Sequence, residues 1–332
     1  MLDNIFILGG GCWATAVASV LKDSKSVTIW EIDPSRRAYF REHGHPEFFP
    51  YVKLHGVKFA EELTIPDGTD LLIAAVPAQT LRAAIVQTSS FVRKKRLPVL
   101  VLSKGIEIKS LKSLDAVCSE ILGRRVPVAV MTGPSHAEEL AVKQPTSVVV
   151  ASKNREFALK IQKLFTKPYF RPYFQSDIRG AAVGGAVKNV MAVAAGVCDG
   201  LGLGMNAKAA LLTRSLAEMT RIGIYMGGKR ATFSGLSGVG DLIVTAFSSH
   251  SRNRNLGEAL GRGMSLDRAK KKVKTTAEGA ETVKALMKIA AKGKVAAPVT
   301  KELFGIMYRS RSAREAIGRL MGRSVKSENE KN

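Results

Sequence analysis

Apolar runs of strand length alternate with helix-like segments through the first half of the chain. The runs DLLIAAV (Asp70–Val76) and PVLVLS (Pro98–Ser103) are almost wholly apolar, as expected for strands buried on both faces. Strands and helices alternating at this spacing predict a mostly parallel sheet covered on both faces. The predicted strands are Asn4–Leu8, Ser26–Glu31, Asp70–Val76, Pro98–Ser103, Val126–Met131, Thr146–Ala151 and Tyr169–Gln175. The predicted helices are Trp13–Lys22, Pro34–His43, Gln79–Phe91, Ser110–Leu122 and Arg155–Phe165.

The pattern of apolar positions changes near Asp177. Beyond it, runs of β-branched residues almost disappear and apolar residues recur at helical spacing. The helices predicted in this half are Ala207–Met226, Arg254–Gly261, Glu278–Ala291, Thr300–Tyr308 and Ser312–Met321. We therefore expect an α/β fold in which a domain with a mostly parallel sheet, residues 1–178, precedes an all-helical domain, residues 179–332.

The first predicted strand runs into a glycine-rich turn, ILGGGCWATA (Ile7–Ala16). Gly9 permits a tight turn, Gly11 permits close approach to a pyrophosphate, and Ala14 is small enough to face the strand. A helix after such a turn presents N–H groups to phosphate at its N-terminus. The turn predicts dinucleotide binding in a Rossmann-type domain, with a plain strand-to-helix connection as the alternative.

Two neighbouring features bear on which dinucleotide would bind. Glu31 ends the second predicted strand, where an acid accepts hydrogen bonds from a ribose 2′-hydroxyl and repels a 2′-phosphate. This position slightly favours NAD, unless Glu31 is only an exposed acid at a strand end. Arg36 and Arg37 could instead bind the 2′-phosphate of NADP, or lie on a solvated helix face. The sequence leaves both cofactors open.

Composition and charge narrow the class of protein. At 332 residues, 45 % hydrophobic and 24 % charged, the chain is long enough for two globular domains. Its 51 Lys and Arg against 28 Asp and Glu give a net charge of +23. Such a field attracts an anionic substrate, nucleic acid or an anionic membrane surface, or else it is only a solvated basic surface. The excess is spread along the chain without an arginine-rich arm, which argues against nucleic acid.

Other sequence features favour a cytoplasmic protein. The most apolar stretch, Ala181–Cys198, carries Lys188 and Asn189 in its middle, so we expect no stable membrane insertion. The N-terminus lacks a basic region followed by a cleavage site, so we expect no signal peptide. Three widely separated cysteines predict neither disulfides nor a metal site. They are Cys12, Cys118 and Cys198.

Four further stretches combine glycine with unexpected polar residues. They are LSKGI (Leu102–Ile106), TGPSHAE (Thr132–Glu138), GGAVKNVM (Gly184–Met191) and LSGVGDLIVTAFSSHSRNRN (Leu236–Asn255). With the opening turn, they resemble the bacterial type of the NAD(P)-dependent glycerol-3-phosphate dehydrogenase family, in matching order over nearly the whole chain. The resemblance implies a Rossmann domain followed by a helical domain, a cytoplasmic location and a homodimer. It also implies reversible hydride transfer between NAD(P)H and dihydroxyacetone phosphate, giving sn-glycerol 3-phosphate for glycerophospholipid synthesis.

The resemblance assigns roles to the residues that match the family's motifs. Lys188 would be the catalytic proton donor and acceptor, and no metal is implied. The substrate would be bound by Lys104, Gly133, Ser135, Lys188, Asp241, Ser251, Arg252 and Asn253. The cofactor would be bound by Gly9, Gly11, Cys12, Trp13, Ala14, Glu31, Lys104, Ala137, Arg252, Thr276 and Glu278.

The proton-transfer residues have a physical reason to act and also a structural alternative. Burying the charge of Lys188 among Ala, Gly and Val costs free energy unless the lysine has a partner. The alternative is that its side chain reaches solvent from a helix. Asp241 would hold and orient that ammonium, or cap a helix over Leu242–Phe247. Thr245 could add a hydroxyl to the site, with helix packing equally expected.

The binding residues have similar alternatives. The forked guanidinium of Arg252 can bind two phosphate oxygens. The alternative is that Ser251–Asn253 is only a polar loop. Lys104 could be an exposed turn lysine, and Ser135-x-x-Glu138 also fits a capping box. We expect His136 to be a bystander, because the family assigns that position no chemistry. Two positions fit either cofactor contact or helix-start chemistry: Thr276 and Glu278.

Three positions depart from the family's usual residues. Cys12 stands for Ser and Ala14 for Gly, and backbone contacts survive both changes. Ile32 stands where bacterial members often carry Arg or His near the adenosine 2′ position, which puts the usual NADP contact in doubt. Two other functions remain as alternatives, a related reductase of another small oxo or hydroxy acid and a non-catalytic nucleotide- or nucleic-acid-binding protein. The SRN trio argues against the first, and the combination of Lys188, Asp241 and Arg252 argues against the second.

Overall fold

The computed structural model describes residues 2–273, 277–325 and 327, and the chain divides into two compact units. Unit 1 combines Met1–Lys104 with Lys112–Ala182, and unit 2 combines Gly105–Leu111 with Val183–Asn332. The short segment of unit 2 that interrupts unit 1 is anchored by Ile106, which is fully buried in the core of unit 2. The later boundary, at Ala182, falls inside a helix rather than at residue 178.

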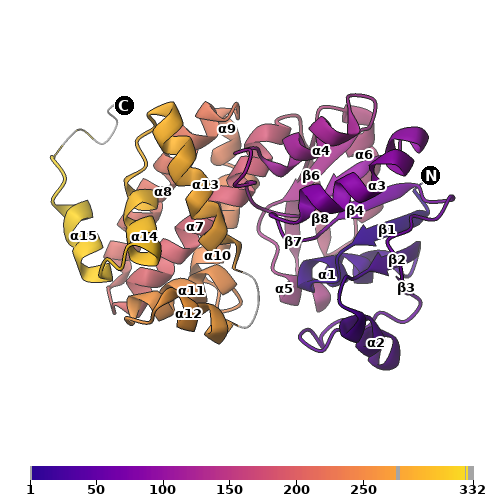
Figure 1. Ribbon diagram of the computed structural model, residues 1–332, viewed down its shortest axis with the longest axis horizontal. Helices are drawn as coiled ribbons and strands as arrows, with labels where there is room; N and C mark the ends of the chain where they lie inside the picture. Colours follow the sequence, from indigo (N-terminus) through magenta and orange to yellow (C-terminus); the bar gives the residue numbers. More distant parts are fainter. Residues whose placement is uncertain (1, 274–276, 326, 328–332) are drawn as a thin grey trace. The chain divides into compact units, whose positions relative to one another are not determined.

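Unit 1 contains, in its described part, an eight-stranded sheet of spatial order β3-β2-β1-β4-β5-β6-β7-β8 (Figure 1). The strands are β1 (Asn4–Leu8), β2 (Ser26–Trp30), β3 (Lys58–Ala60), β4 (Leu71–Ala74), β5 (Val99–Val101), β6 (Val128–Thr132), β7 (Thr146–Ser152) and β8 (Phe170–Gln175). Neighbouring strands are parallel except β6 and β7. The predicted mostly parallel sheet is confirmed. Because the chain passes from β3 at one edge to β4 beside β1, the carboxyl end of β1 lies at a switch point, where open sheets bind ligands.

Helices of unit 1 bury one apolar side against this sheet. They are α1 (Cys12–Leu21), α2 (Pro34–His43), α3 (Leu81–Lys95), α4 (Leu114–Leu122), α5 (Ala137–Ala141) and α6 (Arg155–Phe165). α3 packs beside α4, whereas α1 contacts α5 and α6. α2 begins at Pro34 because proline suits the first helical position and the preceding Asp33 carboxylate accepts from Ser35 N at 3.0 Å.

Two segments of unit 1 differ from expectation. The predicted helix Ser110–Leu122 begins only at Leu114, because Leu111 has a left-handed backbone (φ 58°) and residues 105–111 belong to unit 2. The edge strand β3 was not predicted, because its three residues are half-buried or exposed and form no apolar run.

The named elements of unit 2 in its described part are all helical, which confirms the predicted all-helical half. The elements are α7 (Ile178–Gly200, which begins in unit 1), α8 (Met205–Tyr225), α9 (Arg230–Phe233), a π-helical turn η1 (Leu236–Gly240), α10 (Asp241–Phe247), α11 (Arg252–Gly261), α12 (Leu266–Val273), α13 (Glu278–Gly293), α14 (Pro298–Tyr308) and α15 (Ala313–Met321). α12 was not predicted, because only three of its residues are apolar.

α7 is the most apolar long helix of the described chain. By length and composition alone it could cross a membrane, yet 94 % of its most apolar window is buried inside the structure. Val187, Val190 and Val193 lie in the core of unit 2. α7 is therefore packed as a core helix, and Lys188 is held inside that core.

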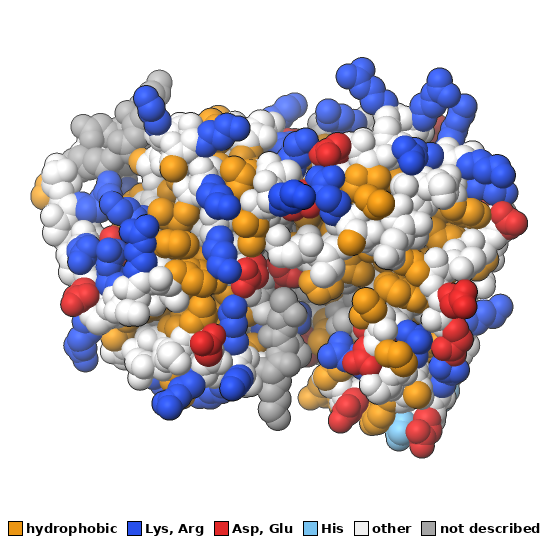
Figure 2. Space-filling view, viewed as in Figure 1, with side chains coloured by type: hydrophobic (Ala, Val, Ile, Leu, Met, Phe, Trp, Pro, Cys, Tyr) orange, Lys and Arg blue, Asp and Glu red, His pale blue; other side chains and the backbone are white. Residues whose placement is uncertain are grey.

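Charged side chains cover the surface of each unit in the same way. Lys and Arg lie over the visible face of both, with fewer Asp and Glu among them (Figure 2). This agrees with an excess of basic residues that is spread along the sequence rather than gathered in one arm.

Candidate functional site

The turn between β1 and α1 requires glycine at its first two positions for reasons within the protein. Gly9 has a left-handed φ of 99°, and a Cβ there would lie 2.9 Å from the carbonyl oxygen of Ala75. A Cβ at Gly10 would lie 2.9 Å from both Glu31 Oε2 and Phe40 Cε2. The N–H of Gly10 donates to Glu31 Oε2 at 2.8 Å. Gly10 was not among the predicted site residues, because its role depends on where the Glu31 side chain lies.

Gly11 differs, because no described atom requires a glycine there. A Cβ would meet nothing within 4 Å, and the φ of −70° suits any residue. α1 begins at Cys12 without a side-chain cap on its N–H groups. Cys12 and Trp13 are partly buried, whereas Ala14 and Ala137, the first residue of α5, are buried. Open space at the N-terminus of a helix is what a pyrophosphate-binding turn requires.

Glu31 is buried at the end of β2, so the alternative of an exposed strand-end acid is wrong; only 6 % of it is exposed. Its Oε1 accepts from the N–H of Asp33 at 3.2 Å. Arg37 is also buried and donates to the carbonyl oxygens of Glu31 and Ile32 at 2.5 and 3.3 Å. The expected solvated helix face is therefore wrong for Arg37, whereas Arg36 is exposed.

Three residues with predicted substrate contacts gather in unit 1 around the carbonyl group of Gly133. Lys104 Nζ and Ser135 Oγ donate to this oxygen at 3.3 and 2.8 Å. Gly133 has a φ of 131°, and a Cβ there would lie 3.1 Å from Val148 Cα in β7. The N-cap of α5 is His136 rather than Ser135, so the capping-box alternative is wrong.

Lys188 in α7 has two polar partners on α10. Its Nζ lies 2.9 Å from Asp241 Oδ1 and donates to Thr245 Oγ1 at 2.7 Å. The Lys188 and Asp241 side chains are only 8 % and 2 % exposed, so the alternative of a lysine reaching solvent is wrong. Asp241 is the first residue of α10, and the N-cap is Gly240, so the predicted cap role is also wrong.

Local sequence explains why these groups meet. Asp241 and Thr245 are four residues apart and project from the same face of α10. Gly184 lies four residues before Lys188, on the same face of α7. A Cβ at Gly184 would overlap the backbone oxygen of Ser237 in η1, so this glycine allows the turn before α10 to approach α7.

Asn253 connects three helices of unit 2. Its Nδ2 donates to Asn189 Oδ1 at 3.0 Å, and its Oδ1 accepts from the N–H of Gly279 at 2.9 Å. The predicted phosphate ligand therefore already uses its oxygen and one amide hydrogen inside the protein. Glu278 begins α13, where the helix dipole favours an acid. Thr276, the other predicted contact near this helix, lies outside the described residues.

Ser251 and Arg252 have different environments at the start of α11. Ser251 caps the helix: its Oγ accepts from the N–H of Arg254 at 3.2 Å, and only 3 % of the residue is exposed. Arg252 is the first helical residue and is exposed. The guanidinium of Arg252 is therefore placed at a helix N-terminus, where anions are favoured.

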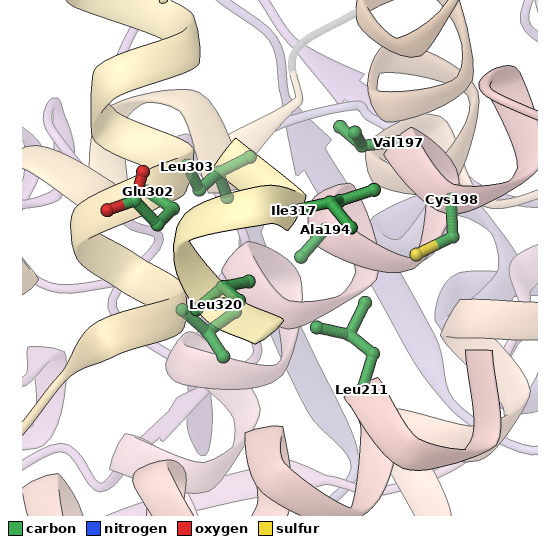
Figure 3. Close-up of a pocket in the computed structure, with 9 residues that line it drawn as sticks. Ala194, Val197, Cys198, Leu211, Glu302, Leu303, Ile317 and Leu320 are labelled. Atoms are coloured by element: carbon green, nitrogen blue, oxygen red, sulfur yellow. The ribbon is translucent and has the colours of Figure 1, made fainter. Parts of the chain in front are cut away.

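A small apolar cavity in unit 2 includes none of the predicted site residues. Figure 3 shows Ala194 and Cys198 of α7 on one side of it and Ile317 and Leu320 of α15 on the other. Its volume of about 30 Å³ suits one water-sized molecule and no substrate. Burial raises the pKa of the Cys198 thiol to about 11, so this thiol stays protonated and unreactive near neutral pH.

Comparison with known proteins gives a consistent result for both halves of the chain. The family model for the N-terminus of NAD-dependent glycerol-3-phosphate dehydrogenase matches residues 4–158. The model for the C-terminus of the same family matches residues 177–318.

Individual relatives are similar over their full length. The chain is 40 % identical over 334 residues to the glycerol-3-phosphate dehydrogenase (NAD(P)+) of Geobacter metallireducens, covering 99 % of each chain. It is 40 % identical over 339 residues to that of Chlorobium phaeobacteroides, covering 98 % of this chain and 99 % of the relative. The crystal structure of glycerol-3-phosphate dehydrogenase from Coxiella burnetii matches with a TM-score of 0.91 at 32 % identity, covering 97 % of this chain and 99 % of that chain.

Proposed function

Because this chain belongs to the NAD-dependent glycerol-3-phosphate dehydrogenase family, we propose that it interconverts dihydroxyacetone phosphate and sn-glycerol 3-phosphate with NAD(H) or NADP(H). The observation that carries the proposal is the buried pair of Lys188 Nζ and Asp241 Oδ1, 2.9 Å apart. A cation inside a core of small apolar side chains is costly, and such groups are concentrated at functional sites.

Residues of unit 1 fit a dinucleotide. The open space at Gly11 beside the N-terminus of α1 suits a pyrophosphate, and Glu31 lies at the strand end where a ribose is bound in this type of fold. The reduced nicotinamide, when bound, supplies a hydride to the C2 carbon of the ketone. The chain must then supply a proton to the ketone oxygen.

Lys188 is the proton donor in this proposal. Its ammonium protonates the carbonyl oxygen as the hydride reaches C2, and its neutral amine takes the proton back from the hydroxyl in the reverse reaction. Asp241 offsets the positive charge. Thr245 donates its only proton to the backbone oxygen of Asp241 at 2.6 Å, so its lone pair is directed to accept from Lys188. Together the two partners hold Nζ in one orientation.

Arg252 is the principal phosphate ligand in this proposal. Its guanidinium is exposed at the first position of α11, where both the side chain and the helix N-terminus attract a dianion. Ser251 and Asn253 shape this end of the helix, because their side chains already bond within the protein. Lys104, in unit 1, stays a predicted substrate contact.

We favour NAD over NADP. Glu31 places a negative charge at the end of β2, and Arg37 donates to backbone oxygens there rather than extending into solvent. Ile32, at the position where bacterial members of the family often carry Arg or His, is 73 % exposed and uncharged. Arg36 is then the remaining candidate to bind the 2′-phosphate of NADP, and its side chain stacks over Phe48, 5.2 Å from the ring centre.

The cellular setting follows from the same proposal. We place the enzyme in the cytoplasm as a homodimer that supplies sn-glycerol 3-phosphate to glycerophospholipid synthesis. Two observations support a cytoplasmic location. The long apolar helix α7 is buried in the core of unit 2, and the three cysteines are free thiols.

Oxidation of NADH and NADPH, followed in parallel at moderate salt, tests the proposed function. We expect turnover with dihydroxyacetone phosphate and a preference for NADH. Absence of turnover with both cofactors would contradict the proposal. Turnover confined to an unphosphorylated oxo acid would instead indicate a related reductase, so both kinds of substrate belong in the assay.

A further inference from the structure

We propose that Asp199 is a positioning residue that holds the phosphate-binding start of α11 in register with Lys188 on α7. This inference rests on the proposed function, because it concerns the spacing between the proton donor and the phosphate ligand Arg252. Asp199 lies near the end of α7, and its side chain is 18 % exposed. It touches neither the proposed proton donor nor Arg252, so its effect is exerted through its partners.

α7 and α11 pack with their backbones in direct contact. Each helix presents two glycines four residues apart, Gly196 and Gly200 on α7 and Gly257 and Gly261 on α11. A Cβ on any of the four would overlap a backbone oxygen of the facing helix. Smooth glycine surfaces bring the helices close, but they have few features that resist sliding along one another.

Asp199 supplies contacts that resist such sliding. Its Oδ2 accepts from Arg254 Nε, in the first turn of α11, at 2.7 Å. Both of its oxygens accept from Lys208 Nζ at 2.9 Å. Lys208 Nζ in turn lies 4.5 Å from the ring centre of Phe247, the last residue of α10. The carboxylate therefore connects the two helix ends that flank residues 248–251.

The start of α11, residues 251–254, is also bonded to the helix that carries Lys188. Arg254, whose side chain bonds to Asp199, also donates its backbone N–H to the Oγ of Ser251, the N-cap residue. One residue earlier, Asn253 bonds to Asn189, the neighbour of Lys188. Arg252 lies between Ser251 and Asn253, whose side chains both make these bonds. Asp199 thus limits how far the Arg252 guanidinium moves relative to Lys188 Nζ.

The test compares Asp199→Asn with wild type on two ketones, dihydroxyacetone phosphate and unphosphorylated dihydroxyacetone. A loosened phosphate end should lower kcat/KM for the phosphorylated ketone by about tenfold, mainly through KM, because the phosphate contact binds the ground state and the transition state alike. Turnover of dihydroxyacetone, which has no phosphate to anchor, should change by less than about twofold. Asp199→Glu, which keeps the carboxylate, should restore part of the loss.

Glu302→Gln is the matched control. It removes another buried carboxylate of unit 2, the partner of Arg311, and should leave the ratio of the two substrates at the wild-type value. In Asp199→Asn, Arg254 keeps Glu258 as a partner at 3.2 Å, but the buried Lys208 ammonium loses its carboxylate, so thermal unfolding of this variant is measured beside its kinetics. Arg254→Gln breaks the same contact from the other side and should reproduce the loss if Asp199→Asn does not fold.

The outcomes separate the two proposals. A wild-type chain without dihydroxyacetone phosphate turnover overturns the proposed function and this inference with it. Wild-type turnover with an unchanged substrate ratio in a folded Asp199→Asn or Arg254→Gln chain overturns the inference alone. An equal loss on both ketones also overturns it, because that result indicates general damage to unit 2 rather than a misplaced phosphate end.

Discussion

At the scale of single residues, the partners of a charged group decide what that group can do. Lys188 lies in an apolar helix, yet a carboxylate at 2.9 Å and a hydroxyl at 2.7 Å offset the free-energy cost of removing its ammonium from water. Removing one member of a buried pair leaves the other charge uncompensated, at a cost of about 3–5 kcal/mol. A change at Lys188 must therefore be judged by a binding measurement as well as by a rate.

Lys188→Ala should lower kcat by about a hundredfold to ten-thousandfold, because it removes the proposed general acid. NADH affinity, measured by fluorescence titration, should stay within about twofold of wild type, since Lys188 is not among the residues predicted to bind the cofactor. Lys292→Ala, at an exposed position of α13 in the same unit, should keep both values. Retained turnover in Lys188→Ala would remove this lysine from the proton-transfer role.

Ile32→Arg should shift the ratio of kcat/KM values toward NADPH by about tenfold, because a guanidinium would face the 2′-phosphate position. The position is 73 % exposed, so stability should change little. The two cofactors are compared by initial rates at saturating ketone. Ile243→Arg, at a residue of unit 2 that is 51 % exposed, is the control and should leave the ratio unchanged.

At the scale of elements, close backbone contacts decide where helices and turns meet. Gly10 has no room for a side chain between Glu31 and Phe40, and Gly257 has none against Val193. At Gly11, by contrast, a Cβ would meet no described atom within 4 Å. Glycines of the first kind serve the fold, whereas Gly11, in the predicted phosphate-binding turn, is expected to leave room for a ligand.

Gly10→Ala and Gly11→Ala should separate these two roles. Gly10→Ala should lower the free energy of unfolding by about 1–3 kcal/mol, since Glu31 and Phe40 must move. Gly11→Ala should change stability by less than about 0.5 kcal/mol but weaken NADH binding by about tenfold. Urea unfolding and fluorescence titration of both variants provide the measurements. Equal cofactor affinity in Gly11→Ala and wild type would argue against a close approach of pyrophosphate.

Gly257→Ala should destabilise the chain by at least about 1–3 kcal/mol, because its Cβ would overlap the backbone oxygen of Val193 in α7. Gly318→Ala is the control within α15, where a Cβ meets nothing within 4 Å. That change should stabilise by about 0.5–1 kcal/mol, as alanine favours a helix interior. Thermal unfolding should therefore shift Tm in opposite directions for the two variants.

At the scale of the whole molecule, the net charge of +23 is the dominant property. On the face that Figure 2 shows, basic side chains are spread over both units rather than concentrated in one patch. A spread field of one sign raises the local concentration of any small anion, and salt screens it within about 10 Å at 0.1 M. The proposed substrate is a dianion, so the field should act on its encounter rate.

Raising the salt from about 20 mM to about 300 mM should lower kcat/KM for dihydroxyacetone phosphate several-fold through this screening. The neutral ketone dihydroxyacetone, assayed under the same conditions, should show little dependence. Parallel falls for the charged and the neutral ketone would show that salt acts on the protein rather than on substrate attraction.

Local sequence determined the order of strands and helices, the change to an all-helical half and the place of the cofactor turn. These features depend on hydrophobic periodicity and on the backbone limits of glycine and proline, which act within a few residues. Segments with weak periodicity, such as β3, α5 and α12, were not predicted from the chain. Family motifs indicated Lys188 and Asp241 as site residues, but their physical partners could not be read from spacing alone.

Only the tertiary structure decided which of these side chains meet. Gly10 bonds to Glu31 across 21 residues, Lys188 to Thr245 across 57, and Asn253 to Asn189 across 64. Periodicity tells which face of a helix is buried, but it does not tell which helix lies opposite. That choice depends on contacts such as the glycine crossing of α7 and α11, where the absence of side chains on both partners sets how closely two distant segments approach.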